Sequence, residues 1–567
     1  MAKQKHRLEH WGSQTGVILA VAGSAVGLGN FLRFPGQVVT NGGGAFMIPY
    51  LISLLVVAIP LSMTEWALGR FAGRRGFHSQ MGMFYLASGR SRGWGMAGGL
   101  MALVPFVINM YYVFIEAWCL LYALQYLGGT LEPIGLGFSF FEGIDPGLHF
   151  ETSEEFSAFF GNMVGKDANG ALFTMTSPLL LATIFCVLGN LLLILRGISG
   201  GVEKVCKLAA PLVLICSLFI IVRVVTFGNP TGLPGRSVLD GLGFMWNPSR
   251  DVLDASGAVV GHTTLLESLK NPDVWLAATA QIFFTVSLCW CSVSTYASYL
   301  RKKDDIALSS LSATATNEFC EVVLGGLITV PPAIMFLGAA NAQEGFTSSF
   351  AMGFSVLANV FDLTPFGQFF GFTFYLILFT AAITTSVSLI QPTVALFQEA
   401  FKWDKTPSVL LVGVVNIVGT FFVCWFSKDL IALNVFDFWV SGVLVFIFAL
   451  LQTWLVAFVW GTSKLQKEIA FGASIKPPTF LANVVKFVSF PYMAIIVIFW
   501  MVKNLGRRIQ EFHEIPVVRY VFVFFALLAA GLLILSGIVT KRWATEGKAR
   551  AQENETTPSL DTKAENN

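Results

Sequence analysis

Charged residues are scarce in this chain. Asp, Glu, Lys and Arg make up only 12% of its 567 residues, whereas 55% are hydrophobic. Because a soluble domain averages roughly 25% charged residues, this composition excludes an ordinary soluble protein and predicts a polytopic protein embedded in the lipid bilayer. The formal net charge of +2 gives no reason to expect a nucleic-acid partner, and we expect none.

Motifs for catalysis and cross-linking are also missing. The sequence has no phosphate-binding loop of the type GxxxxGK[ST] and no metal-ligating or nucleophilic constellation, which disfavours an ATP-driven pump or a membrane enzyme. No cleavable signal peptide is evident, because the first 14 residues are polar and basic. The eight cysteines lie in or beside apolar segments, with neither a disulfide framework nor zinc-site spacing; they are Cys119, Cys186, Cys206, Cys216, Cys289, Cys291, Cys320 and Cys424.

Long apolar runs dominate the chain instead. A helix needs about 20 apolar residues to cross a hydrocarbon core of about 30 Å. About twelve runs meet this length, and we number them as segments 1 to 12. They span residues 15–37, 44–68, 96–127, 177–195, 204–227, 273–300, 310–340, 366–398, 408–427, 435–460, 484–504 and 518–540. The predicted fold class is an all-α integral membrane protein with twelve transmembrane helices.

Basic residues indicate the orientation of these segments. Lys and Arg gather before segment 1, between segments 2 and 3, after segment 6 and after segment 12. Since cytoplasmic loops carry an excess of Lys and Arg, both termini are predicted to be cytoplasmic. The absence of loop disulfides and of outward glycosylation sites favours a bacterial inner (plasma) membrane.

The segments divide the chain into six parts. We expect a cytoplasmic N-terminal segment with part of an inner gate (1–14), a first repeat holding segments 1–5 (15–227), an extracellular loop (228–272), a second repeat holding segments 6–10 (273–460), segments 11 and 12 (461–545), and a polar cytoplasmic tail without aromatic residues that is predicted to be disordered (546–567).

Segment 1 is interrupted near its middle. Residues 23–35 read GSAVGLGNFLRFP, with three glycines in seven residues. A broken helix in hydrocarbon leaves backbone polar groups unpaired unless protein or a water-filled cavity surrounds them. The freed carbonyls can hold a cation, and the second half-helix can hold an anion at its N-terminus. Close helix packing is the alternative, but it does not explain the following Asn30 and Arg33, so we interpret Gly23–Gly27 as the floor of a binding site.

Segment 6 shows a second interruption, because hydroxyl residues crowd an otherwise apolar run: Thr285, Ser287, Ser292, Ser294 and Thr295. Hydroxyl groups alone are common at helix contacts. However, segments 1 and 6 would each be the first of five consecutive membrane segments. Two interrupted helices at corresponding positions predict a transporter built from a five-plus-five inverted repeat, with unwound helices in segments 1 and 6 and a site at the membrane midplane.

Nearly the whole chain resembles the neurotransmitter:sodium symporter (sodium:neurotransmitter symporter) family, with close similarity to its bacterial leucine transporter. The matching stretches are AVGLGNFLRFP (25–35), NGGGAFMIPY (41–50), RGIS (196–199), QIFFT (281–285), TYASY (295–299) and DFW (437–439). The resemblance implies alternating access, in which segments 1, 2, 6 and 7 rock against the others.

The resemblance also implies two sodium sites. The first would lie beside the substrate carboxylate and would use Ala25, Asn30, Thr285 and Asn317. The second would use the carbonyls of Gly23, Val26 and Ala381 with the hydroxyls of Thr384 and Thr385. Carbonyl, amide and hydroxyl oxygens suit a hard cation such as Na+. For Asn317, an ordinary interhelical hydrogen bond is the alternative.

The family's substrate pocket maps onto residues of segments 1, 3, 6 and 8: Ser24, Ala25, Gly27, Ile108, Tyr112, Phe284, Thr285, Ser287, Trp290, Thr385 and Leu389. Tyr112 would donate its hydroxyl to the substrate carboxylate, unless it is an ordinary buried tyrosine. Ile108 and Trp290 are bulkier than their counterparts in the leucine transporter, whereas Ser24 is smaller. We therefore predict a small neutral amino acid, glycine or alanine; an indole that turned away would admit a larger one.

The resemblance further implies two gates. Arg33 and Asp437 match the extracellular pair. Arg7 and Glu399 match the cytoplasmic pair less closely, because Arg7 is displaced by one position and Glu stands where the family has Asp. Three more residues match those that brace the inner gate: Ser298, Tyr299 and Glu203.

Glu321 is the most informative single position. Animal members have Ser there and bind chloride beside it, whereas bacterial members that resemble this chain have Glu. A carboxylate among Tyr50, Gln281 and Thr285 would build the negative charge into the protein, so transport is predicted to be independent of chloride. A proton carried by Glu321 on the return step is a further hypothesis, and a purely structural Glu is the alternative.

Together these motifs predict a sodium-coupled secondary symporter of a neutral amino acid rather than an enzyme. Its partners would be the amino acid, Na+ and lipid, with a homodimer left open. The alternatives are a symporter of a larger hydrophobic amino acid, and a channel or sensor that keeps the fold without coupled transport.

Overall fold

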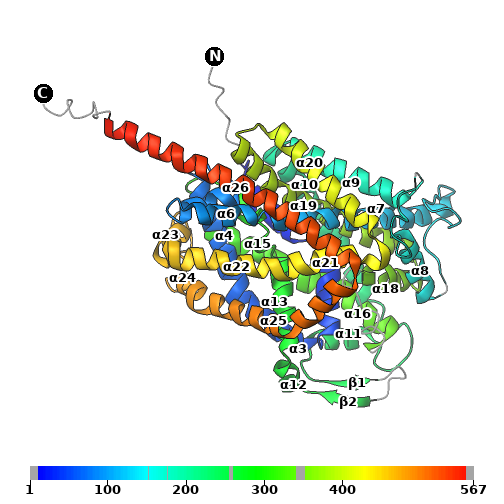
Figure 1. Ribbon diagram of the computed structural model, residues 1–567. Coiled ribbons are helices and arrows are strands. Elements are labelled where there is room, and N and C mark those ends of the chain that lie inside the picture. Colours follow the sequence, from blue (N-terminus) through cyan, green and yellow to red (C-terminus); the bar gives the residue numbers. More distant parts are fainter. Residues whose placement is uncertain (1–10, 151, 175, 254–258, 340–350, 557–567) are drawn as a thin grey trace.

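The structure of this chain is a computed structural model. It describes residues 11–150, 152–174, 176–253, 259–339 and 351–556. Helices make up most of this part of the chain and pack side by side into one body (Figure 1). The all-α class is confirmed.

The first five membrane segments follow the predicted order. They are α1 (Gln14–Ala25) with α2 (Phe34–Thr40), α3 (Gly44–Ser53) with α4 (Ile59–Gly73), α6 (Arg92–Leu100) with α7 (Leu103–Leu131), α9 (Pro178–Leu195), and α10 (Glu203–Val225).

Segments 6 to 12 complete the body. They are α13 (Pro272–Thr285) with α14 (Ser292–Ser298), α15 (Ile306–Glu318) with α16 (Gly326–Leu337), α19 (Gly367–Phe401), α20 (Lys405–Trp425), α21 (Ile431–Trp439) with α22 (Val445–Trp454) and α23 (Thr462–Ala470), α24 (Leu481–Val484) with α25 (Phe490–Glu514), and α26 (Pro516–Thr556).

Length and hydropathy support this count. Among the described residues, ten helical stretches are long and apolar enough to cross a membrane, and the bent pair in segment 1 makes eleven. Segment 6 is the twelfth. Its break divides it into helices of 14 and 7 residues, each too short to qualify alone.

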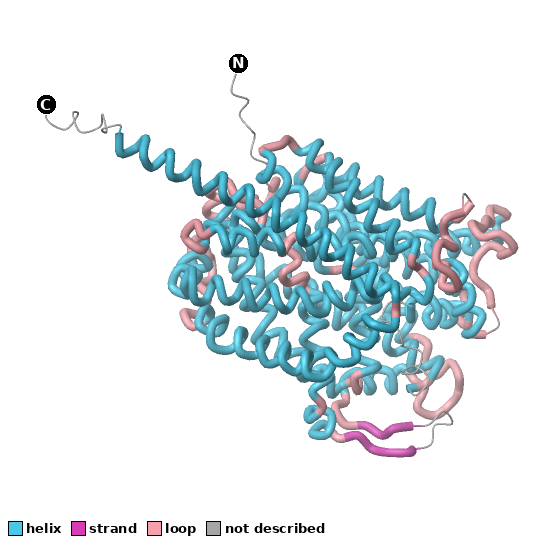
Figure 2. The backbone as a smooth tube through the Cα atoms, in the orientation of Figure 1, coloured by secondary structure: helices cyan, strands magenta, loops and turns pink. Residues whose placement is uncertain are grey.

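Short elements fill loops that the sequence analysis left without structure. They are α5 (Gln80–Ala87), α8 (Ser153–Met163), α11 (Val238–Trp246), the antiparallel strands β1 (Arg250–Leu253) and β2 (Val259–Thr263), α12 (Leu265–Lys270) and α18 (Ala351–Asp362). The hairpin projects from one end of the helical body (Figure 2). Three of these helices begin with a capping box, at Thr152, Ser237 and Thr264, a signal that is readable in the sequence.

The tail differs from its prediction. Disorder was expected from residue 546, but α26 continues to Thr556 and extends beyond the body (Figure 1). The stretch that suggested disorder contains Ala as well as polar Glu, Lys and Gln, all of which are strong helix formers. Residues 557–567 lie outside the described residues.

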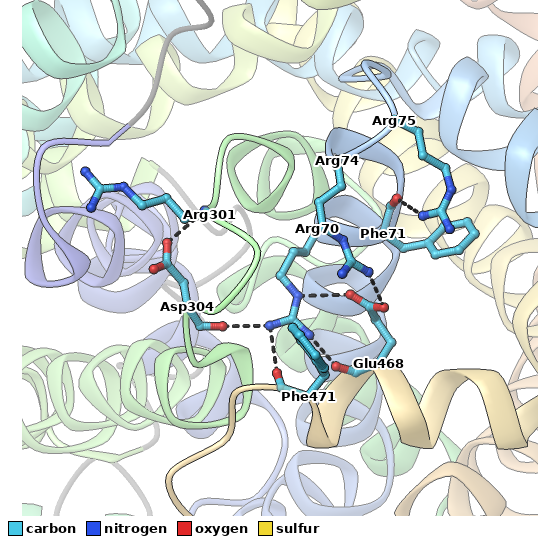
Figure 3. A network of polar contacts seen from close by, with 8 residues as sticks. All are labelled: Arg70, Phe71, Arg74, Arg75, Arg301, Asp304, Glu468 and Phe471. Atoms are coloured by element: carbon cyan, nitrogen blue, oxygen red, sulfur yellow. Dashed lines mark hydrogen bonds and ion pairs between the residues drawn. The ribbon is translucent and has the colours of Figure 1, made fainter. Parts of the chain in front are cut away.

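A buried network joins segments 2 and 10 at the end of the body that we call the inner end, predicted to be cytoplasmic (Figure 3). Arg70 has a fully buried side chain, and its Nε lies 2.9 Å from Glu468 Oε1. Its Nη1 donates to the carbonyls of Asp304 at 2.6 Å and Phe471 at 2.9 Å. Arg74 Nη2 lies 2.6 Å from Glu468 Oε2. We call Arg70, Arg74, Glu468 and these two carbonyls the inner latch.

Candidate functional site

Segment 1 is broken where its glycines predicted. The chain leaves the helix after Ala25 and bends by 47° before it continues at Gly29. The break is closed locally, because Gly27 N–H donates to Asn30 Oδ1 at 2.8 Å and Asn30 N–H donates to Gly27 O at 3.2 Å. A π-helical turn follows at Gly29–Arg33, a local form that often marks functional sites.

Segment 6 is broken between Thr285 and Ser292. Three residues there, Ser287, Cys289 and Cys291, have φ between +52° and +63°, a left-handed backbone that costs a non-glycine residue roughly 1–2 kcal/mol. Glu65 of segment 2 holds the break, because its Oε1 accepts the Cys289 N–H at 2.7 Å. This contact was not predicted from the sequence.

The residues predicted for the first sodium site lie together between the two breaks. Asn30 Nδ2 donates to Asn317 Oδ1 at 2.9 Å, and Asn317 Nδ2 donates to Thr285 Oγ1 at 2.9 Å. All three side chains are buried, and Ala25, the fourth predicted residue, is the last residue of α1. The oxygens in this set are neutral amide, hydroxyl and carbonyl groups, a donor set that fits a hard monovalent cation.

Four of the five residues predicted for the second sodium site line one cavity of about 350 Å3. Its wall includes Gly23, Val26, Ala381 and Thr384, together with apolar side chains of segments 5 and 7. Thr384 Oγ1 donates to Ala381 O at 2.9 Å. The fifth residue, Thr385, donates its hydroxyl to Ser24 O at 3.1 Å. The wall of this cavity is almost entirely apolar, and the contact between segments 1 and 8 from the Thr385 hydroxyl to the Ser24 carbonyl involves residues next in the chain to those that line it.

Segments 1, 3 and 8 approach one another most closely at Gly27. A Cβ at this position would lie 2.7 Å from both Thr385 Oγ1 and Tyr112 Oη, so only glycine fits. Tyr112 accepts the Leu28 N–H at 3.2 Å. The hydroxyl of Tyr112 thus lies at the N-terminal end of the second half-helix, where a carboxylate is favoured.

Bulky side chains fill the part of the pocket predicted to receive the substrate side chain. The rings of Phe284 and Trp290 meet edge to face with centroids 5.1 Å apart. Both rings are buried, as are Ile108 and Leu389. Ser287 Oγ instead contacts Ser24 O at 3.4 Å, and the Ser24 hydroxyl contacts Ser388 of segment 8 at 2.7 Å. Ser388 was not predicted from the sequence.

Glu321 is fully buried beside the first sodium site. It accepts hydrogen bonds from Gln281 Nε2 at 3.0 Å, Tyr50 Oη at 3.0 Å and Asn30 Nδ2 at 3.2 Å. The predicted charge-balance residues therefore form one network that reaches the site through Asn30. Sequence reasoning missed Glu318, whose Oε2 lies 2.7 Å from Tyr50 Oη and so competes with Glu321 for its single hydrogen.

The predicted extracellular gate pair is not formed. Among the described ion pairs none joins Arg33 to Asp437. The Arg33 guanidinium lies over the Phe284 ring, 4.2 Å from its centroid. Asp437 Oδ1 accepts from Tyr111 Oη at 2.8 Å instead. Pairing depends on the conformation of the outer end, which the sequence does not specify.

The predicted inner-gate residues are tightly bonded, although Arg7 lies outside the described residues. Glu399 accepts from Ser79 N–H at 2.7 Å and Ser79 Oγ at 2.6 Å. Glu203 accepts from Gly12 N–H at 3.0 Å and Lys207 Nζ at 2.7 Å. Two further contacts complete the closure: Ser298 Oγ lies 2.9 Å from His78 Nδ1, and the Tyr299 ring stacks on His78 with centroids 4.4 Å apart.

Comparisons with known proteins agree with this geometry. A model described as the sodium:neurotransmitter symporter family matches residues 8–133 and 254–545. The chain is 28% identical to an uncharacterized sodium-dependent transporter of Methanocaldococcus jannaschii, over 82% of this chain and 85% of that protein. It is 24% identical to the sodium- and chloride-dependent GABA transporter 2 of Homo sapiens, over 81% of this chain and 74% of that one.

A solved structure is also similar. The crystal structure of MhsT in complex with L-phenylalanine superposes with a TM-score of 0.69 at 25% identity. The match covers 86% of this chain and 99% of that chain.

Proposed function

The chain belongs to the sodium:neurotransmitter symporter family, and from this premise we propose that it couples inward sodium flow to the uptake of a small neutral amino acid. The observation that carries the proposal is the meeting of two different surfaces at the breaks of segments 1 and 6. One surface presents neutral oxygens of Asn30, Thr285 and Asn317, which are linked by hydrogen bonds of 2.9–3.4 Å. The other presents Tyr112 and a helix N-terminus.

These two surfaces explain coupling. The substrate carboxylate would bind Tyr112 and the N-terminal end of the second half-helix, and Na+ would bind the oxygens opposite. The ion would then lie beside the carboxylate, so each would raise the affinity for the other by the same factor. Alternating access would follow when segments 1, 2, 6 and 7 rock against the other segments.

The pocket supports a small substrate. Phe284, Trp290, Ile108 and Leu389 are buried around the position of the substrate side chain. A single methylene in such a pocket changes discrimination by roughly 1–3 kcal/mol. A second candidate, a larger hydrophobic amino acid, is favoured by the L-phenylalanine in the MhsT complex, and it would require the Trp290 indole to move.

Glu321 supports transport without chloride. Its carboxyl lies 3.2 Å from Asn30, and thus next to the proposed ion. We expect Glu321→Ser to make uptake dependent on chloride. Uptake by the wild-type protein is expected to stay the same when gluconate replaces chloride. Uptake by Glu321→Ser that is equal with and without chloride would contradict this assignment.

We further propose that both termini face the cytoplasm of a bacterial inner membrane. The basic loops support this orientation, and labelling of a single cysteine added after residue 556 from either side of the membrane would test it. A homodimer is proposed as the assembly, to be tested by the mass of the protein–detergent complex.

Radiolabelled uptake into proteoliposomes with an inward sodium gradient tests the function. Glycine, alanine, leucine and phenylalanine would be compared, with potassium replacing sodium as the control. Sodium-dependent uptake of glycine or alanine alone supports the proposal, whereas uptake of leucine or phenylalanine selects the second candidate. Saturable uptake separates a symporter from a channel or sensor, since a channel conducts ions without substrate and a sensor moves nothing.

A further inference from the structure

Ser24 and Ser388 form a polar contact between segments 1 and 8 whose direction can be assigned. Ser388 Oγ lies 2.7 Å from the carbonyl of Thr385, which can only accept a hydrogen bond. A serine hydroxyl carries one hydrogen, so Ser388 donates it to Thr385. At 2.7 Å from Ser388 Oγ, the Ser24 hydroxyl must therefore be the donor. Ser24 has no hydrogen left to give to a substrate.

A third hydrogen bond closes a ring. Thr385 Oγ1 donates to Ser24 O at 3.1 Å. Thr385 and Ser388 are three residues apart on α19 and so lie on one face of that helix. Segment 8 therefore holds Ser24 at two points, its hydroxyl and its carbonyl. We call Ser24, Thr385 and Ser388 the helix clamp; all three are at most 3% exposed.

The helix clamp lies beside the proposed second sodium site. Gly23 precedes Ser24 in the chain, and Thr384 precedes Thr385. A Cβ added to Gly23 would lie 3.3 Å from Cys206 Sγ and 3.8 Å from Thr384 Cβ, so the helices are already close at this level. An ion held between two helices needs oxygens from both at a fixed separation, and that separation depends on the residues that support the ligands.

We propose that Ser388 is a positioning residue for sodium, which acts through Ser24 to set the spacing between the segment 1 carbonyls and the segment 8 hydroxyls. The proposal rests on the proposed sodium-coupled transport. It also reassigns the Ser24 hydroxyl from a substrate contact to the helix clamp.

The first test is Ser388→Ala in the full-length, reconstituted protein. The sodium concentration for half-maximal uptake is expected to rise about tenfold, the low end of the effect of removing a residue that supports a metal ligand. The preference among glycine, alanine and leucine is expected to stay unchanged. Thr393→Val is the matched control, because Thr393 Oγ1 donates to Ile390 O at 2.7 Å within the same helix. A merely structural role would lower protein yield or stability without moving the sodium dependence.

Ser24→Ala separates the two roles of Ser24. The helix clamp predicts the same rise in the sodium requirement as Ser388→Ala, and no further rise in the double variant. A changed amino-acid preference with an unchanged sodium requirement would overturn the proposal and return Ser24 to the substrate pocket. An unchanged sodium requirement in Ser388→Ala would overturn it as well.

A second measurement tests the helix clamp without transport. The thermal midpoints of the wild type, both single variants and the double variant are compared in sodium-free buffer. Residues in direct contact give non-additive effects, so we expect the double variant to lose less than the sum of the single losses. Additive losses would reject the helix clamp even in an active transporter. Non-additive losses in a protein that transports nothing would keep the contact and reject the proposed function.

Discussion

Arg33 at the outer end of the molecule and Arg70 at the inner end differ in their hydrogen-bond partners. At the outer end, Arg33 Nε and Nη1 are buried without a hydrogen-bond partner, and the guanidinium rests on Phe284. At the inner end, Arg70 is fully buried and bonded to Glu468 and to two backbone carbonyls (Figure 3). The inner latch is formed, whereas the predicted gate pair of the outer end is not; we call this the unlatched state of the outer end.

This difference describes the conformation seen in the structure, with the inner latch formed and the outer gate pair unformed. The inner latch depends only on residues of segments 2 and 10 and the loop after segment 6. Its bonds are therefore available without any ligand. The outer arginine lies over Phe284, and Asp437 is held by Tyr111. Pairing of Arg33 with Asp437 would therefore require these side chains to rearrange.

The largest expected effect comes from breaking the inner latch. Glu468→Ala leaves the buried Arg70 without its carboxylate, and breaking a buried ion pair in this way costs roughly 3–5 kcal/mol. We expect the variant to populate an inward-open state, measured as increased modification of an engineered cysteine at Val26 by a thiol reagent applied to the inner side. Glu511→Ala is the control, because it removes the ion pairs of one segment 11 carboxylate with Arg507 and Arg508, none of which belongs to the inner latch. Equal modification in wild type and Glu468→Ala would contradict the inner latch.

A smaller effect is expected from the aromatic ring that packs against Phe284 in the proposed substrate pocket. Trp290→Phe removes one ring against which Phe284 packs. Because the Phe side chain is smaller than the Trp side chain by the size of a few methylenes, we expect the preference for leucine over glycine to shift by roughly 1–3 kcal/mol. Uptake competition between the two amino acids measures this shift. An unchanged preference would show that the indole does not limit the pocket.

The outer gate pair should matter for rate but not for stability. Asp437→Asn removes a charge that makes no described ion pair in the unlatched state, so the thermal midpoint is expected to change little. The rate of uptake is expected to fall about tenfold, which equals about 1.4 kcal/mol, because the pair with Arg33 would form only when the outer end closes. A large loss of thermal stability in Asp437→Asn without a loss of uptake rate would contradict this assignment of Asp437 to the outer gate.

The smallest effect is expected at an ion pair of the inner end in which only the lysine reaches solvent. Lys207 Nζ lies 2.7 Å from Glu203; the lysine side chain is 46% exposed and the Glu203 side chain 2%. Exposed helical pairs contribute about 0.3–0.5 kcal/mol, and the buried Glu203 carboxylate keeps hydrogen bonds from Gly12 and Ser13 without the lysine. Lys207→Gln should therefore leave uptake and thermal stability nearly unchanged, since Glu203 keeps its bond to Gly12. A loss as large as that of Glu468→Ala would place Lys207 in the closure of the inner end.

The sequence predicted the breaks because their causes are local. The glycines at 23, 27 and 29 and the hydroxyl residues of segment 6 stand next to one another in the chain. The resemblance to the family predicted which residues bind the ion. The structure brings three of them, Asn30, Thr285 and Asn317, together across nearly 300 residues. Neither source could give the state of the outer gate, because an ion pair between Arg33 and Asp437 depends on how two segments far apart in the sequence are placed.

The missed residues have a different cause. Ser388 and Glu65 are ordinary residues in their own segments. Their roles arise from partners at Ser24, 364 residues away, and at Cys289, 224 residues away. Pairings of this kind are set by how the helices pack. Among the short helices outside the membrane segments, by contrast, the capping boxes at Thr152, Ser237 and Thr264 were readable signals that were not used.

The central claim is that ion and substrate bind as one coupled unit at the breaks of segments 1 and 6. The most direct measurement is glycine and alanine binding to the purified protein at several sodium concentrations, together with sodium binding at several substrate concentrations. The account predicts that sodium strengthens binding of the amino acid and that the amino acid strengthens sodium binding by the same factor. Sodium and amino-acid affinities that are independent of each other would contradict it.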